Sequence, residues 1–257
     1  MKKFIKKKII SIIKGLLLLF KAPIEVSKKN YLFKFNNILI KIFTSSSITY
    51  RRWIKFEKDG KEKETIEWIN SFEEGSIFFD IGANVGVFSI YGALKKKLKV
   101  YSFEPDPNSF IELYNASKLN DANIVPLLIA LDSDKNSKYF NMLNFEAGLS
   151  DNFLSEKKIG ESFMLTTETL DNLIEGNLTE TPDYVKIDVD GNEKNILNGM
   201  SKTIRNRKLK SILIELDDSS KFSYYENFFK EHNFKLELRN LESGNNIFTR
   251  QKKDEII

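Results

Sequence analysis

From residue 76 onward, short apolar segments alternate with amphipathic ones, and this alternation restricts the fold more than any other feature. Five segments have the character of buried strands: residues 76–81, 99–103, 124–131, 184–187 and 211–215. Helical periodicity lies between them, for example over residues 108–119 and 193–204. Such alternation is typical of a parallel sheet with crossover helices. Residues 234–239 and 246–250 read as a final hairpin. We therefore predict an α/β fold with a doubly wound, mostly parallel sheet, closed by an antiparallel C-terminal hairpin.

The segment before this pattern divides into two parts. Residues 31–35 and 38–43 read as two strands around Asn36-Asn37, and residues 48–72 read as helical in pieces. We therefore expect three units: a basic amphipathic arm (1–30), a hairpin and helical extension (31–72) and the α/β domain (73–250). The polar stretch 133–165 has no clear period, and we expect it to cover the site as a loop or β-insertion.

Charge is distributed unevenly between the arm and the rest of the chain. Residues 1–30 hold nine lysines and one glutamate, whereas the remainder holds 31 basic and 35 acidic side chains. The body is therefore acidic, which argues against nucleic-acid binding along one face. Within residues 3–21, apolar side chains recur at three- and four-residue steps opposite a lysine face, but no apolar run is long enough to span a bilayer. Two interpretations stay open: peripheral contact with an anionic membrane, or packing on the protein or on a second copy.

Two residue counts exclude whole classes of chemistry. The chain has no cysteine, so disulfides, thiolate metal sites and thiol catalysis are ruled out. A single histidine, His232, leaves no room for a multi-histidine metal centre, and we expect it at the surface near a helix end. Any acid–base chemistry must therefore rest on other side chains, chiefly carboxylates.

The first strand of the α/β pattern ends in a glycine loop that leads into a helix. The stretch 78–88 reads FFDIGANVGVF, and its glycines Gly82 and Gly86 do not match the G-x-G-x-x-G pattern of dinucleotide binding. No Gly-Lys-Ser or Gly-Lys-Thr follows, so it is not a phosphate-binding P-loop. Asp80 places a carboxylate beside the loop, where a phosphate would be repelled and a sulfonium or ammonium favoured. The loop therefore predicts a site for a cationic ligand without phosphates.

The second strand ends in another carboxylate. Glu104 lies 22 residues after Gly82, at the position where an acid can accept hydrogen bonds from both ribose hydroxyls of a nucleoside. An acid at the loop, an acid for the ribose and no phosphate contacts together indicate S-adenosylmethionine as cofactor.

A cluster of acids follows the fourth and fifth strands. Asp188 and Asp190 are two residues apart, and Glu215 ends the next strand. These strand ends meet at one edge of a parallel sheet, where a carboxylate can remove the proton of an acceptor hydroxyl during methyl transfer. Two alternatives remain at this point: a divalent cation held by the three acids, or Glu193 and Glu215 merely pairing with Lys186 or capping a helix.

The motifs together resemble the FkbM family of S-adenosylmethionine-dependent methyltransferases. The matching stretches are DIGANVGVFS (80–89), FEPDPNSFIELYNASKLN (103–120), IALDSD (129–134), TLDNLI (169–174), VKIDVDGNEKNILNGM (185–200) and ILIELD (212–217), within roughly residues 64–250. The resemblance implies a Rossmann-like methyltransferase sheet. The sequence departs from the family at Asp132-Ser133, where the usual order is Ser-Asp, and at Asp190, where glutamate is usual.

The resemblance also implies roles for individual residues. The loop of Asp80, Gly82, Asn84 and Gly86 would hold the methionine part of the cofactor. Glu104 would hold the ribose, and Asp132 or Ser133 the adenine edge. Independently of the resemblance, the position of the acids at the strand ends predicts Asp188, Asp190 and Glu215 as the catalytic residues.

These observations predict an O-methyltransferase that acts on a hydroxyl of a sugar, glycan or glycolipid without a metal. The alternatives are a catalytically inactive, nucleoside-binding partner subunit and an RNA methyltransferase. We expect a cytoplasmic protein. If the arm binds lipid, the protein would be peripheral at the inner face of the membrane. The acceptor and the oligomeric state are left open.

Overall fold

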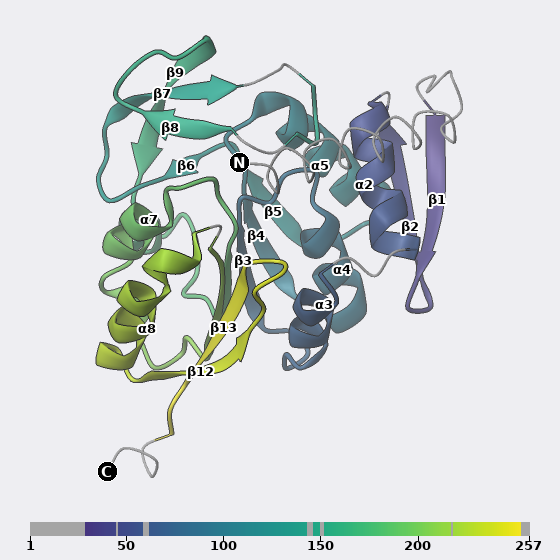
Figure 1. Cartoon of the computed structure of the whole chain (residues 1–257). Coiled ribbons are helices and arrows are strands. Elements are labelled where there is room, and N and C mark those ends of the chain that lie inside the picture. The colour runs from purple at the N-terminus through teal and green to yellow at the C-terminus, as the bar shows by residue number, and fades with distance from the viewer. Residues whose placement is uncertain are drawn as a thin grey trace, which may run out of the picture.

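The computed structural model describes residues 29–44, 46–58, 62–142, 146–149, 152–216 and 218–252. The amphipathic arm predicted for residues 1–30 lies almost entirely outside these ranges and stays a prediction. Figure 1 shows a central sheet with helices on both faces, a hairpin beside one helical layer and a smaller sheet at one end. No helix of the described ranges is both long enough and apolar enough to cross a membrane.

The central sheet has seven strands in the order β12-β13-β11-β10-β3-β4-β5. Their bounds are β3 Ile77–Ile81, β4 Lys99–Phe103, β5 Ile124–Leu127, β10 Tyr184–Ile187, β11 Ser211–Glu215, β12 Phe234–Arg239 and β13 Asn245–Arg250. The strands from β11 to β5 run parallel, β13 is antiparallel to them, and β12 is antiparallel to β13 and so runs in the same direction as the parallel strands. β3 and β10 are buried along their whole length, as expected for strands covered on both faces. The predicted α/β class with a mostly parallel sheet is confirmed.

Helices cover the two faces of this sheet and divide the core into two clusters. The helices are α3 Lys63–Asn70, α4 Val87–Lys96, α5 Pro107–Leu119, α6 Leu170–Glu175, α7 Glu193–Gly199 and α8 Phe222–Glu231. Phe78 of β3 packs with residues of α3 and α4, whereas Phe79 packs with residues of α6, α7 and α8. Alternate strand residues therefore face different helical layers. The strand order reverses at the neighbouring strands β3 and β10. From β3 the chain builds the sheet toward one edge, and from β10 it builds toward the other, which opens a crevice at the carboxyl ends of these two strands.

The N-terminal hairpin and the helix that follows it pack in the same core cluster as α3 and α4. β1 (Lys29–Phe35) and β2 (Ile38–Thr44) form an antiparallel hairpin whose two turn residues, Asn36 and Asn37, both have positive φ, as a tight hairpin turn requires. α2 (Ser47–Lys58) follows, and its Trp53 is buried in the cluster that contains Phe78. The extension thereby brings α2 alongside the α/β body.

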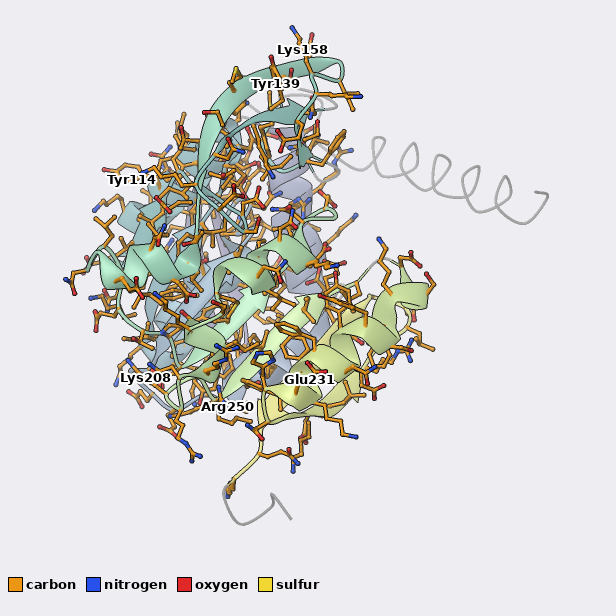
Figure 2. All side chains as sticks on the ribbon, turned by 90° about the vertical axis from the view of Figure 1, so that its left-hand side faces the viewer. Tyr114, Tyr139, Lys158, Lys208, Glu231 and Arg250 are labelled. Carbon is orange, nitrogen blue, oxygen red and sulfur yellow. The ribbon has the colours of Figure 1, made fainter. Side chains whose placement is uncertain are left out.

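The stretch 133–165 forms most of a small second sheet. Its strands are β6 Ala130–Leu131, β7 Ser137–Met142, β8 Phe153–Ser155 and β9 Glu161–Glu168, in the order β6-β9-β7-β8. In Figure 2, Tyr139 and Lys158 of this sheet lie at one end of the molecule, and Lys208, Glu231 and Arg250 lie at the other. The second sheet therefore stands at the carboxyl ends of the parallel strands.

Two predicted elements have different bounds in the structure. The strand predicted over residues 124–131 is split, because the chain leaves the edge of the central sheet at the half-exposed Leu128 and then pairs with β9 instead. The helix predicted over residues 193–204 ends at Gly199 and continues as a short 3₁₀ turn, Thr203–Arg205. The Asp171 carboxylate accepts hydrogen bonds from the backbone of Lys202 and Thr203, which stabilises this separate turn.

Candidate active site

Two adjoining cavities open at the carboxyl ends of the parallel strands. The first, of about 270 Å³, lies between the ends of β3, β4, β10 and β11 and the second sheet. The other, of about 420 Å³, lies between α2 and the loop that leads into α4. The residues that line both cavities are Arg52, Glu62, Gly82, Asn84, Leu149 and Asp188. The cavities therefore meet at the point where ligands bind in open α/β sheets.

The glycine loop after β3 is fixed by its neighbours on both sides. The backbone N–H groups of Gly82 and Ala83 donate to the Phe103 carbonyl at the end of β4, at 3.0 and 3.1 Å. Gly82 has a φ of +78°, and a Cβ at this position would lie 1.9 Å from the Asp188 carbonyl oxygen. Only glycine therefore allows the loops after β3 and β10 to approach so closely.

Replacing Gly82 by alanine is expected to lower the free energy of unfolding by roughly 2–4 kcal/mol, because the new Cβ meets backbone and the φ is unfavourable. Gly160→Ala is the matched control: its φ is +67°, but nothing lies within 4 Å of the new Cβ, so only about 1 kcal/mol should be lost. Thermal unfolding of both variants measures the difference. Equal losses would contradict the close approach of the two loops.

Glu104 lies in the wall of the first cavity with both carboxylate oxygens held. Its Oε2 accepts a hydrogen bond from the Asn84 N–H at 2.6 Å, and its Oε1 accepts one from the Asp106 N–H at 2.8 Å. Burial raises the pKa of Glu104 to about 8, although these two hydrogen bonds act in the opposite direction. Each oxygen keeps a further lone pair, so the ionised carboxylate can accept from two hydroxyl groups of a ligand.

The pKa of Glu104 predicts how nucleoside binding depends on pH. If the ionised form accepts the ribose hydroxyls, affinity must rise with pH and level off above about pH 8. Between about pH 6.5 and pH 9 the gain should be roughly 30-fold for 5′-methylthioadenosine, a ligand without an amino or carboxyl group. Calorimetry of Glu104→Gln should give weak, pH-independent binding, while Glu215→Gln should keep the slope. A flat profile for the unmodified protein would contradict this role.

A buried lysine stands behind the site. Lys186 of β10 is 1% exposed, its Nζ lies 2.5 Å from Asp188 Oδ2 and 4.9 Å from the centre of the Phe88 ring, and it is in register with Asp80 of β3. Burial alone would lower the pKa of Lys186, but the charges of Asp188 and Asp80 raise it above its usual value. Lys186 is therefore held as a cation.

Asp80 belongs to this buried group and not to the cavity walls. Its Oδ2 accepts a hydrogen bond from the Ser89 hydroxyl at 2.6 Å, and its Oδ1 has no hydrogen-bond partner among the described residues. Burial raises the pKa of Asp80, whereas Lys186 opposes that shift. We predicted that Asp80 contacts the ligand together with the glycine loop. The structure places its carboxylate beneath that loop, outside both cavities.

Asp188 and Glu215 form a carboxyl pair at the ends of β10 and β11. Burial alone would raise the pKa of Asp188, but the Lys186 ammonium and a hydrogen bond with Glu215 lower it. Burial raises the pKa of Glu215, and the hydrogen bond with Asp188 and its negative charge raise it further. These opposite shifts favour the proton on Glu215 and the ionised form of Asp188.

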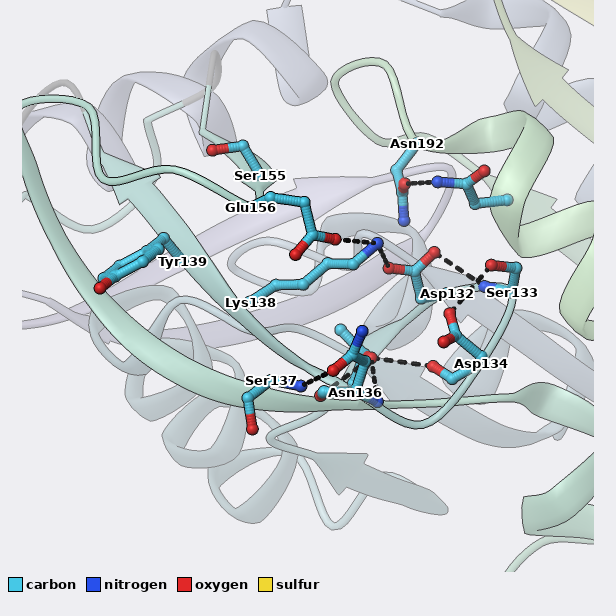
Figure 3. Close-up of polar contacts among 12 residues, drawn as sticks. Asp132, Ser133, Asp134, Asn136, Ser137, Lys138, Tyr139, Ser155, Glu156 and Asn192 are labelled. Atoms are coloured by element: carbon cyan, nitrogen blue, oxygen red, sulfur yellow. Dashed lines mark hydrogen bonds and ion pairs between the residues drawn. The ribbon is translucent and has the colours of Figure 1, made fainter.

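Asp132 is engaged by the second sheet. Figure 3 shows Lys138 of β7 between Asp132 and Glu156, and the Lys138 Nζ lies 2.7 Å from Asp132 Oδ2 and 3.4 Å from Glu156 Oε1. The other oxygen of Asp132 accepts from the Ser133 N–H. Neither Asp132 nor Ser133 is among the cavity-lining residues, whereas the preceding residues 129–131 are. Asp132 therefore joins the second sheet to the wall of the cavity.

The structure brings together six of the ten predicted site residues. Gly82, Asn84, Glu104, Asp188, Asp190 and Glu215 line the first cavity, and Asp80, Gly86, Asp132 and Ser133 line neither one. Sequence reasoning missed Arg52 and Glu62, which reach the site from the N-terminal extension. The sequence of this helical stretch carries no signal that it packs over the ends of β10 and β11, which lie more than a hundred positions away.

The residues of the first cavity fit S-adenosylmethionine by their chemistry. Five carboxyl groups line it, from Glu62, Glu104, Asp188, Asp190 and Glu215, with Arg52 as the one cationic side chain among the described lining residues. Such a wall suits a cationic sulfonium and a ribose, and it does not suit a pyrophosphate. Within the described ranges, no three acidic or histidine side chains are grouped as ligands for a metal ion.

An α/β sheet with an acidic cavity at its switch point, and without a phosphate-binding glycine pattern, agrees with the class of S-adenosylmethionine-dependent methyltransferases. The model of the methyltransferase FkbM domain matches residues 80–236, more than half of the chain. The protein therefore belongs to the FkbM methyltransferase family, whose methyl donor is S-adenosylmethionine.

Two known proteins show how far the similarity extends. Hexuronic acid methyltransferase AglP of Haloferax volcanii is 27% identical over 135 residues, which are 52% of this chain and 53% of that protein. The chain thus spans about half the length of this curated relative. The crystal structure of methyltransferase FkbM from Methylobacillus flagellatus KT matches with a TM-score of 0.51 and 17% identity, over 69% of this chain and 44% of that one. This second likeness shows the fold.

Proposed function

We propose that the protein transfers the methyl group of S-adenosylmethionine to a hydroxyl of a sugar, glycan or glycolipid. The observation that carries this proposal is the Asp188–Glu215 carboxyl pair in the same cavity as Glu104. A ribose-binding acid and a proton-accepting pair are what methyl transfer to a hydroxyl requires. The similarity to a hexuronic acid methyltransferase supports a carbohydrate acceptor.

Bound S-adenosylmethionine supplies an electrophilic methyl group on a sulfonium centre. Glu104 would hold the ribose hydroxyls, and the backbone of the Gly82 loop would contact the methionine part. The acceptor oxygen has to lie in line with the carbon–sulfur bond, so alignment supplies a large part of the rate. The strand-end carboxylates hold that oxygen from the opposite side.

The carboxyl pair provides for the acceptor proton. Asp188, kept ionised by Lys186, can hold the acceptor hydroxyl by accepting its hydrogen bond. Burial and the neighbouring Asp188 raise the pKa of Glu215 and favour its protonated form, and a cationic ligand nearby would favour its ionisation. The acceptor proton then passes to the pair as the oxygen–carbon bond forms, a step that general bases accelerate by about 10²–10⁴-fold.

The N-terminal extension takes part in this site. Arg52 and Glu62 come from residues 31–72, and both line the first cavity. We therefore propose that this extension and residues 73–250 act as one functional unit.

The proposal is tested with methyl-labelled S-adenosylmethionine and fractionated extracts of the source cells. Label is expected in the carbohydrate or glycolipid fraction, and it should be released as a methylated sugar by acid hydrolysis. Label found in RNA would support the RNA methyltransferase alternative. Tight cofactor binding without transfer to any fraction would support a nucleoside-binding partner subunit.

A further inference from the structure

Cationic side chains from one helix line the second cavity. Arg51, Arg52 and Lys55 of α2 face the segment that runs from Gly82 into the first turn of α4. In the first cavity, by contrast, the charged lining residues are carboxylates except for Arg52. The two adjoining spaces therefore have opposite preferences for ligand charge.

Arg52 stands at the boundary between the two spaces. It lines both, and its Nε donates a hydrogen bond to the Gly148 carbonyl, which fixes the position of the guanidinium. Among the described residues, its two terminal nitrogens make no hydrogen bond, so they are available to a ligand. A guanidinium held in this way presents two parallel donors, the geometry that matches a carboxylate.

The path of the cofactor leads from one space into the other. With the ribose at Glu104, the sulfonium would lie near Gly82 and Asp188, because both residues line both cavities. The amino-acid chain beyond the sulfur then follows residues 82–88 into the second cavity. The Glu62 carboxylate on the shared wall suits its ammonium group, and the Arg52 guanidinium suits its carboxylate.

The family resemblance assigns the methionine part of S-adenosylmethionine to the Gly82 loop, which lines the second cavity. We infer that Arg52, supplied by the N-terminal extension, binds the carboxylate at this end of the cofactor. This inference rests on the proposed function. Arg51 has a different role, because its guanidinium bonds back to the Ser47 carbonyl and hydroxyl within α2. The two neighbouring arginines therefore form a matched pair, one directed at the ligand and one at its own helix.

The experiment compares two ligands that differ only at this end. S-adenosylhomocysteine carries the amino acid, and 5′-methylthioadenosine has a methyl group in its place. Calorimetry gives both affinities for the full chain and for Arg52→Ala, Arg52→Lys and Arg51→Ala. The ratio of the two affinities cancels every contribution that the ligands share, including any effect of the arginine charge on Glu104.

Arg52→Ala is expected to lower this ratio by about 10- to 100-fold, since it removes a charge-assisted hydrogen-bonded pair. Arg52→Lys should give a ratio between those of the unmodified protein and Arg52→Ala, because an ammonium keeps the charge but loses the two parallel donors of the guanidinium. Arg51→Ala should change the ratio by less than about threefold. An unchanged ratio in Arg52→Ala, or an equal fall in Arg51→Ala, would overturn the inference. Failure of both ligands to bind the unmodified protein would overturn the proposed function instead.

Discussion

Asp188→Asn is expected to lower the rate of methyl transfer by about 10²–10⁴-fold, while the affinity for S-adenosylhomocysteine stays within a few fold. Asparagine has nearly the same shape, so the cavity keeps its form. It cannot accept the acceptor proton, and it no longer shares a proton with Glu215. Single-turnover rates with a labelled methyl donor, together with calorimetry of the same variant, separate the two effects.

Asp134→Asn is the matched control, because Asp134 is an exposed carboxylate outside both cavities. It should leave both the rate and the affinity unchanged. Glu215→Gln should reduce the rate by a comparable factor to Asp188→Asn, since either change destroys the pair. If Asp188→Asn keeps most of its activity, Asp188 has a structural role and Asp190 becomes the leading candidate.

Lys186→Met should lower the free energy of unfolding by about 3–5 kcal/mol near pH 7. Methionine fills the space of the lysine stem, but it leaves Asp80, which is 1% exposed, without a compensating charge. Without Lys186 the pKa of Asp80 rises further above its unfolded value. An acid of this kind contributes less stability as pH rises through its folded pKa, so the deficit should shrink as the pH falls to about 5.

Denaturant unfolding at several pH values checks this prediction, and Lys210→Met is its control. Lys210 also carries ion pairs, to Glu73 and Asp183, but its side chain is 37% exposed. Its loss should remove no more than about 1 kcal/mol. Adding Asp80→Asn to Lys186→Met should restore part of the stability. A deficit that stays constant with pH would show that packing, and not charge, accounts for it.

The central strands were predictable because each combines a short apolar run with a clear terminator. β4, β10 and β11 have the bounds that their sequences indicate, and Glu104, Asp188 and Glu215 stand at their ends. In a parallel sheet, strand ends share one edge, so these acids could be placed together from the sequence pattern alone.

Other parts of the site depend on contacts that no local pattern encodes. From the sequence, Asp80 is expected to contact a ligand at the glycine loop. In the structure its side chain points into the core, where it is in register with Lys186 and accepts a hydrogen bond from Ser89. Asp132 is neutralised by Lys138, which is brought to it by the pairing of β7 with β9. Arg52 reaches the cavities only because Trp53 anchors α2 in the core.

Because the Gly82 α-carbon rests against the Asp188 carbonyl, the loop after β3 and the loop after β10 cannot move independently. Backbone contact fixes the separation of the two loops, and the ion pair with Lys186 restricts rotation of the Asp188 carboxylate. Thermal fluctuation should therefore displace donor and base together, as one rigid body. The alignment needed for the reaction is then already present in the resting protein, and turnover should be limited by the arrival and orientation of the acceptor.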